Sequence, residues 1–225
     1  MYVTIPSAHG APVLRISQPK RRFRSAEARF KAGDYLYFEG DQVQYVYEVK
    51  IGVLRLTRLL EDGRRQVISF GYPGDIVGFP SGGLHHTDCD VLVDTRVVPY
   101  SRAALEDGTQ DPQLHHDLLQ AALSEISAMQ DHFLMLGRKS AAERVASFLC
   151  ALSERVGQRL GQYRQVDLPM SRADIADFLG LTTETVSRSL TQLRKAKVIA
   201  IDNIHTVVIL RPQALLGLSV GHKEG

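Results

Sequence analysis

The sequence predicts an α+β protein in which an antiparallel, jelly-roll-like β-roll is followed by a long helix and a C-terminal domain of short helices. Three observations lead to this prediction. Short β-rich runs fill the first half of the chain, one uninterrupted helical run follows, and the pattern then changes to short helices and a β-hairpin. The 225 residues suffice for one large domain or for a medium domain plus a small one, and 44% apolar with 23% charged residues is an ordinary globular balance.

Strand signals dominate from residue 32 to about residue 100. The β-rich runs are residues 35–38, 45–59, 67–70, 76–79 and 91–93. Glycines recur among them at intervals of 11 or 12 residues, and Asp62-Gly63 is a typical hairpin turn. Short strands at this spacing predict an antiparallel barrel or jelly roll rather than a parallel sheet with crossover helices.

A long helix is predicted next, because no proline or glycine interrupts residues 113–136. Apolar residues in it alternate at spacings of three and four, as in the seam of a coiled coil. The seam consists of Leu119, Ala122, Ile126, Met129, Phe133 and Leu136, and Gly137 ends the run. We expect two copies of the chain to form a homodimer along this seam. The alternative is a helix that packs on its own β-roll.

Charge is unevenly distributed along the chain. Residues 138–225 contain 13 Lys and Arg against 8 Asp and Glu, whereas the rest of the chain has 14 against 17. A basic C-terminal part favours a polyanionic partner. We therefore expect an N-terminal arm (1–30), a β-roll domain (31–110), a dimerisation helix (111–137) and a basic C-terminal domain (138–225). That last domain would open with a helix at 140–156 and a loop at 157–165.

Two short helices separated by a tight turn form the centre of the C-terminal domain. The first would begin at Ser171, which forms a capping box with Asp174, and would end at Gly180, where a left-handed backbone is allowed. Thr182 is a good N-cap for the second helix, and Val186 would pack between the two. This is the pattern of a DNA-binding helix-turn-helix. Residues 198–201 and 206–210 would add a β-hairpin, which makes it a winged helix-turn-helix.

The second helix carries the residues suited to reading bases, because its N-terminal half enters the major groove. Arg188 can donate two hydrogen bonds to guanine, and Glu184 can accept one from cytosine. With phosphate contacts included, the predicted DNA-binding residues are Ser171, Arg172, Thr182, Thr183, Glu184, Ser187 and Arg188. We predict sequence-specific binding to double-stranded DNA.

Over about residues 30–212, these features together resemble the CRP/FNR family of bacterial transcription regulators. Residues 73–78, Pro-Gly-Asp-Ile-Val-Gly, are similar to the family's β-roll signature. Residues 179–188 resemble the recognition helix of the FNR and FixK branches, and residues 137–149 also resemble the FixK branch. The resemblance implies an activator that binds TTGA/TCAA-type palindromes, contacts RNA polymerase and controls microaerobic or nitrogen-related genes.

The sequence lacks the residues that form two kinds of sensor site in related proteins. No cysteine precedes Cys89, whereas an N-terminal cysteine cluster holds the iron–sulfur centre of FNR. Residues 78–87 lack the glutamate and arginine by which cyclic-AMP binders hold the nucleotide. We therefore expect no cofactor. The alternative is a regulator of the same family that senses a haem-bound gas, redox state or a small ligand. In that case His85, His86 and Cys89 could be donors to haem iron or zinc. Otherwise these three residues belong to a solvated loop.

A more remote alternative is a cupin-type metal enzyme, because residues 74–85 resemble the second cupin motif. No histidine lies between His9 and His85, so the metal-ligand set is incomplete, and we predict neither an enzyme nor a metal site. No apolar run is long enough to span a membrane, and no secretory signal is recognisable. Two cysteines, Cys89 and Cys150, do not make a disulfide scaffold. We expect a cytoplasmic protein with no membrane partner.

Overall fold

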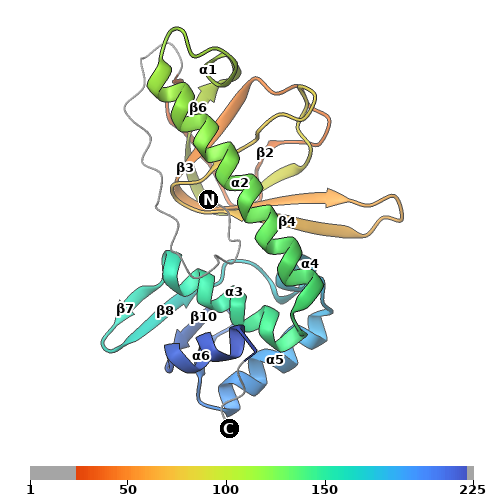
Figure 1. The fold of residues 1–225 in the computed structure, drawn as a ribbon, viewed down its shortest axis with the longest axis vertical. Coiled ribbons are helices and arrows are strands. Elements are labelled where there is room, and N and C mark those ends of the chain that lie inside the picture. Colours follow the sequence, from red (N-terminus) through yellow and green to blue (C-terminus); the bar gives the residue numbers. More distant parts are fainter. Residues whose placement is uncertain (1–23, 222–225) are drawn as a thin grey trace. The chain divides into compact units, whose positions relative to one another are not determined.

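The computed structural model describes residues 24–221, which divide into two compact units (Figure 1). The first unit ends at Met129 and the second begins at Gln130, within the long helix α2 (Pro112–Arg138). Most of the predicted N-terminal arm lies outside the described residues. Among the residues described, no helix combines the length and the apolar character needed to cross a membrane.

The first unit is built on an antiparallel sheet, as the β-rich runs predict. Its strands are β1 (Ala28–Phe30), β2 (Tyr35–Tyr37), β3 (Tyr45–Leu59), β4 (Arg65–Gly71), β5 (Ile76–Val77) and β6 (Asp88–Ser101). The main path runs β1-β6-β3-β4, with β2 paired to β6 and β5 paired to β3. Strands β3 and β6 pair along almost their whole length, and the short helix α1 (Arg102–Glu106) follows β6.

One glycine explains how β3 bends. Gly52 has a φ of +96° and lies where the register between β3 and β6 shifts. A Cβ atom there would lie 2.7 Å from the Asp94 carbonyl oxygen, so glycine is required. The predicted turn at Asp62-Gly63 is also confirmed, since Gly63 has a φ of +81° between β3 and β4.

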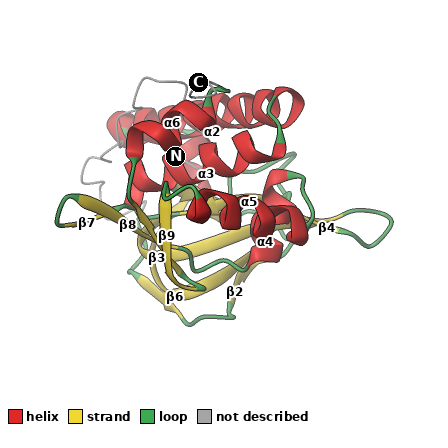
Figure 2. Cartoon of the chain, turned by 90° about the horizontal axis from the view of Figure 1, so that it is seen from below, coloured by secondary structure: helices red, strands yellow, loops and turns green. Residues whose placement is uncertain are grey.

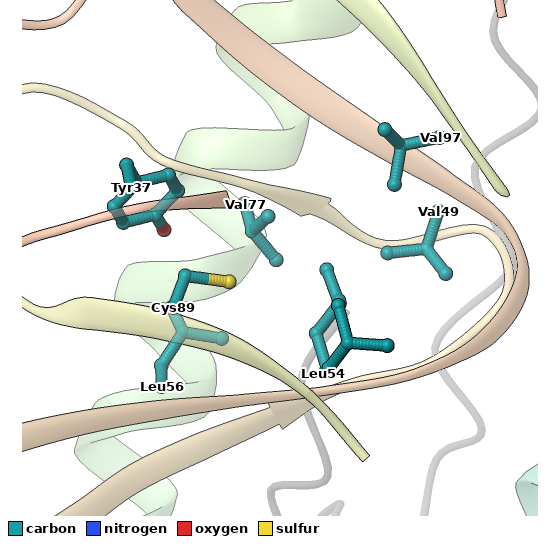
Figure 3. Packing of buried hydrophobic residues seen from close by; sticks show 8 residues of the cluster. Tyr37, Val49, Leu54, Leu56, Val77, Cys89 and Val97 are labelled. Carbon is teal, nitrogen blue, oxygen red and sulfur yellow. The ribbon is translucent and has the colours of Figure 1, made fainter. Parts of the chain in front are cut away.

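Apolar side chains fill the interior of the roll. Val49, Leu54, Val77 and Val97 are completely or almost completely buried and face one another (Figure 3). A second cluster joins β3 and β6 to α1 and to the first turns of α2, where Leu114 and Leu118 are buried. Burial of apolar area supplies most of the stabilisation of such a unit.

The second unit combines helices with a small antiparallel sheet (Figure 2). After the end of α2 come α3 (Ala141–Val156), β7 (Gln158–Leu160), β8 (Tyr163–Asp167), α4 (Arg172–Leu179), α5 (Thr183–Lys195), β9 (Ile199–Asn203), β10 (Thr206–Ile209) and α6 (Pro212–Ser219). The sheet order is β7-β8-β10-β9, so the predicted wing, β9–β10, lies at one edge.

Three sequence-based expectations about elements need correction. The predicted loop at 157–165 is wrong, because β7 and β8 form a hairpin that turns at Gly161, where φ is +60°. Strand β8 pairs with β10, and this long-range pairing outweighs its polar sequence. Helix α2 continues past Gly137 to Arg138. Strand β1 and helices α1 and α6 were not expected at all.

Candidate functional site

The α4–α5 pair has the local geometry that its sequence predicts. The Ser171 hydroxyl accepts a hydrogen bond from the Asp174 amide at 3.1 Å, and the Asp174 carboxylate accepts from the Ser171 amide at 2.9 Å. Gly180 adopts the left-handed conformation, with φ at +61°. The Thr182 hydroxyl accepts from the Thr185 amide at 3.2 Å and so caps α5. The turn between the helices is therefore fixed at both of its ends.

The inner faces of both helices are buried. Phe178 and Leu179 of α4 and Val186 of α5 have no exposed surface, and Leu190 is also buried. The anchored inner face leaves the opposite face of α5 in solvent. That outer face contains Thr183, Glu184, Ser187 and Arg188, all of them exposed. The structure thus brings four of the predicted DNA-binding residues onto one surface next to the Thr182 cap.

An ion pair organises this exposed face. An Nη atom of Arg188 donates to Oε1 of Glu184 at 2.5 Å, and the two side chains are 74% and 71% exposed. Such an exposed pair stabilises the helix by only a few tenths of a kcal/mol. In the structure the pair places the guanidinium group beside the Glu184 carboxylate. The Ser187 hydroxyl donates to the Thr183 carbonyl at 2.9 Å, so its oxygen lone pairs remain available as acceptors.

Arg172, in the first turn of α4, differs from the exposed cations. Its side chain is half-buried, and Nη1 is enclosed without a hydrogen-bond partner among the described residues. Burial lowers the pKa of the guanidinium group, which remains cationic at neutral pH. A buried N–H donor without an acceptor is costly, and the enclosed Nη1 is not itself open to a phosphate oxygen.

The wing is tied to the segment that precedes α4. The Leu168 amide donates to the His205 carbonyl at 2.7 Å, and Nδ1 of His205 lies 3.1 Å from the Leu168 carbonyl oxygen. Ile204, at the tip of the wing, is 73% exposed. The sequence did not predict an exposed apolar residue at this tip, because no sequence pattern marks Ile204 as different from other apolar residues.

Helix α2 has two apolar faces. One face is buried and includes Leu114, Leu118 and Ala128. On the other, the seam residues Leu119, Ile126, Met129 and Phe133 are between 40% and 72% exposed, whereas Ala122 and Leu136 are half-buried. Leu123 and Leu134, which the spacing of the seam omits, are also exposed. A run of exposed apolar side chains along one helix is typical of a protein–protein interface.

The three suspected sensor residues do not form one site. His85 and Cys89 are buried, so the expectation of a solvated loop is wrong for them, and His86 alone is exposed. Burial lowers the pKa of His85, whose ring stacks on Tyr37 at 3.6 Å between centroids. Burial also raises the pKa of the Cys89 thiol, which therefore stays protonated. Over residues 24–221, no group of His, Cys, Asp and Glu is arranged to hold a metal ion.

A cavity of about 200 Å³ lies beside these residues in the first unit. Ser69 and His85 are among its lining residues, and each has a buried polar atom, Ser69 Oγ and His85 Nδ1, without a partner among the described residues. Arg58 also lines the cavity, but it is paired with Glu39 at 3.1 Å and contacts His86. The remaining lining is mostly apolar, but it includes Thr87 and Glu125.

Two regions of the chain match known protein families. Residues 27–110 match the cyclic nucleotide-binding domain, and residues 143–218 match the Crp-like helix-turn-helix domain. The first region contains the β-roll, and the second contains α4, α5 and the wing.

Several relatives resemble the chain over most of its length. The nitrogen fixation regulation protein FixK of Rhizobium meliloti (strain 1021) is 41% identical over 191 residues, which cover 85% of this chain and 86% of that protein. FixK of Bradyrhizobium diazoefficiens is 42% identical over 173 residues, which cover 76% and 73%. The solved structure of FixK2 from Bradyrhizobium japonicum superposes with a TM-score of 0.78 at 38% identity and covers 86% of this chain and 96% of that one.

Proposed function

This chain belongs to the CRP/FNR family of DNA-binding transcription regulators, and we propose that it binds a palindromic DNA site as a homodimer, with α5 of each copy in the major groove. The observation that supports this most strongly is the exposed face of α5, where Glu184 and Arg188 project from a helix anchored by its buried side. The family is one of transcription regulators, not of enzymes.

In the proposed complex, base contacts and phosphate contacts come from different residues. Arg188 donates to O6 and N7 of guanine, Glu184 accepts from N4 of cytosine, and Ser187 contacts a neighbouring base edge. Phosphates are held by the capped N-terminus of α5 with Thr182 and Thr183, and by Ser171 and Arg172 at the start of α4. The half-site is of the TTGA type, repeated in inverted form as TCAA.

The proposed dimer forms along the exposed face of α2. The seam of Leu119, Ala122, Ile126, Met129, Phe133 and Leu136 would pair with its copy, which would also cover Leu123 and Leu134. The two recognition helices would then reach half-sites about one turn of DNA apart. In this proposal the chain consists of an arm (1–30), a β-roll domain (31–110), a dimerisation helix (111–137) and a DNA-binding domain (138–225).

The FixK relatives support a more specific role. They are named regulators of nitrogen fixation, and we propose that this protein activates nitrogen-related or microaerobic genes in the cytoplasm, with RNA polymerase as its partner. In this proposal the dimer needs neither a cofactor nor a metal ion.

A second candidate function keeps the same fold and adds control by a small ligand. It is favoured by the cavity in the β-roll, whose lining includes Ser69 and His85, two residues with buried polar atoms that have no partner among the described residues. A ligand there would be compact, and mostly apolar with a few hydrogen-bonding groups.

Fluorescence anisotropy distinguishes these candidates. The full chain, purified without added metal, haem or nucleotide, is titrated onto a TTGA/TCAA palindrome and onto a scrambled duplex at one fixed salt concentration. Tight and selective binding is the expected result and means that the dimer is competent without an effector. Weak binding to both duplexes would contradict the proposal in that form and would favour ligand control through the cavity.

A further inference from the structure

Arg144 is bonded to the backbone of two chain segments that are far apart in sequence. From the first turn of α3, its Nη2 donates to the Leu136 carbonyl at 2.7 Å and its Nε donates to the Lys139 carbonyl at 3.0 Å. Its Nη1 donates to the Leu179 carbonyl at 3.0 Å and to the Gly180 carbonyl at 3.4 Å. One guanidinium group thus holds the end of α2 and the turn between α4 and α5.

The chemistry of helix ends explains why these acceptors suit an arginine. The last carbonyl groups of a helix have no donor within the helix and carry its partial negative charge. Leu136 lies in the last turn of α2, and Leu179 is the last residue of α4. A planar cation with five N–H donors can satisfy carbonyl groups of both helix ends at once, which an ammonium group cannot do with the same geometry.

The surrounding residues fix Arg144 and bring the two helix ends into contact. Ser140 and Glu143 form a capping box that fixes the first turn of α3. At Gly180 a Cβ atom would lie 3.5 Å from a methyl group of Leu136 and 3.6 Å from Nη1 of Arg144. The end of α2 and the turn after α4 therefore lie close together around the guanidinium group.

We propose that Arg144 is a positioning residue for DNA binding, which fixes the helix-turn-helix to the last turn of α2 and makes no contact with DNA itself. The proposal rests on the proposed function, in which α2 joins the two copies and α5 reads the half-site. Arg144 then sets the spacing and angle between the two recognition helices. Its loss should affect binding to two half-sites together far more than binding to one.

The variants are Arg144→Ala and Arg144→Lys, with Arg164→Ala as the matched control. Arg164 also donates to a backbone carbonyl, that of Ser153 in the last turn of α3 at 2.8 Å, but it does not bond the α4–α5 turn. The duplexes carry a complete palindrome, one half-site beside random sequence, and palindromes with the spacer shortened or lengthened. Thermal unfolding of each variant identifies a temperature at which all of them are folded.

Arg144→Ala should weaken binding to the palindrome about tenfold, because charge-assisted hydrogen bonds that hold two segments together are lost. Binding to the single half-site should change by no more than about twofold, as for substitutions outside the contact surface. The preference for one spacer length should broaden. Arg144→Lys should be intermediate, and Arg164→Ala should resemble the parent. Equal losses for Arg144→Ala and Arg164→Ala, or an unchanged spacer profile in Arg144→Ala, would overturn the proposal.

Amide hydrogen exchange tests the same contact without DNA. The Lys139 amide bonds the Met135 carbonyl and the Leu181 amide bonds the Ala176 carbonyl, each at 3.0 Å, so they report on the two ends that Arg144 holds. Exchange at both should be about tenfold faster in Arg144→Ala and unchanged in Arg164→Ala. If the unsubstituted protein does not bind the palindrome more tightly than random sequence, the proposed function fails. In that case, unchanged amide exchange at Lys139 and Leu181 in Arg144→Ala would refute the positioning role as well.

Discussion

Arg188 is the side chain on which base choice depends in the proposed complex. Replacement by alanine should cost about 1–3 kcal/mol per half-site on the palindrome and reduce selectivity, because a bidentate contact to guanine is lost. Anisotropy titrations on palindromic and scrambled duplexes measure both effects. Arg194→Ala, at the exposed end of α5, is the control and should affect the two duplexes equally. Equal losses for Arg188→Ala would show that it binds phosphate instead of reading a base.

His132 links pH to stability in the second unit. Its ring stacks on Phe178 at 4.3 Å between centroids. Its pKa is lowered from 6.5 to about 4, mainly by burial, which outweighs the opposing hydrogen bond with the Phe178 backbone and is supported by the charge of Arg144. The pKa in the folded state is below that in the unfolded state. The stabilisation is therefore complete above about pH 6.5 and is lost as the pH falls towards 4. The loss should reach about 3 kcal/mol at most.

Urea unfolding at pH 7.5, 5.5 and 4.5 tests this expectation. The parent should lose stability faster than His132→Phe over this range, because phenylalanine keeps the ring contact and takes up no proton. Carboxylates that titrate at acid pH are common to both proteins and cancel in the comparison. Parallel stability curves would show that His132 is not responsible for the pH dependence.

At the scale of the element, the exposed face of α2 is the feature whose role is easiest to test. Ile126→Glu or Phe133→Glu should shift the protein from dimer to monomer, because each would bury a charge in an apolar seam. The exposed fractions of Ile126 and Phe133, 53% and 72%, indicate that neither substitution should unfold the chain itself. Sedimentation equilibrium measures the association.

The matched control is Leu160→Glu, which replaces a leucine that is 48% exposed in β7, outside the seam. This variant should remain a dimer. A Phe133→Glu protein that sediments as the dimer would place the interface elsewhere on the molecule.

At the scale of the whole molecule, the uneven charge predicts a strong dependence of DNA binding on salt. Residues 138–225, which contain α4 and α5, have 13 Lys and Arg against 8 Asp and Glu and so carry a net charge of +5, whereas the rest of the chain, with 14 against 17, carries −3. The logarithm of the association constant should fall linearly with the logarithm of salt concentration. Arg172→Ala should reduce the magnitude of that slope by about 2 per dimer, since one phosphate contact is lost from each copy. An unchanged slope would exclude Arg172 from the phosphate contacts.

The sequence by itself determined the parts of the protein that depend on neighbouring residues. The strand from Tyr45 to Leu59, the capping box of Ser171 and Asp174 and the left-handed Gly180 agree with their predictions. These features arise from side-chain periodicity, capping hydrogen bonds and backbone sterics, which operate over a few residues. The exposed face of α5 follows from the same periodicity, which is why its residues were predictable.

Only the tertiary structure decided the features that depend on contacts between distant segments. The β7–β8 hairpin forms in a polar sequence because β8 pairs with β10, and His85 is buried against Tyr37, about 50 residues earlier in the chain. Arg144 has no local signal that distinguishes it from a solvated helix residue, yet its guanidinium group holds two helix ends. The physical reason is that burial and long-range hydrogen bonds depend on which segments meet, and local sequence patterns do not contain that information.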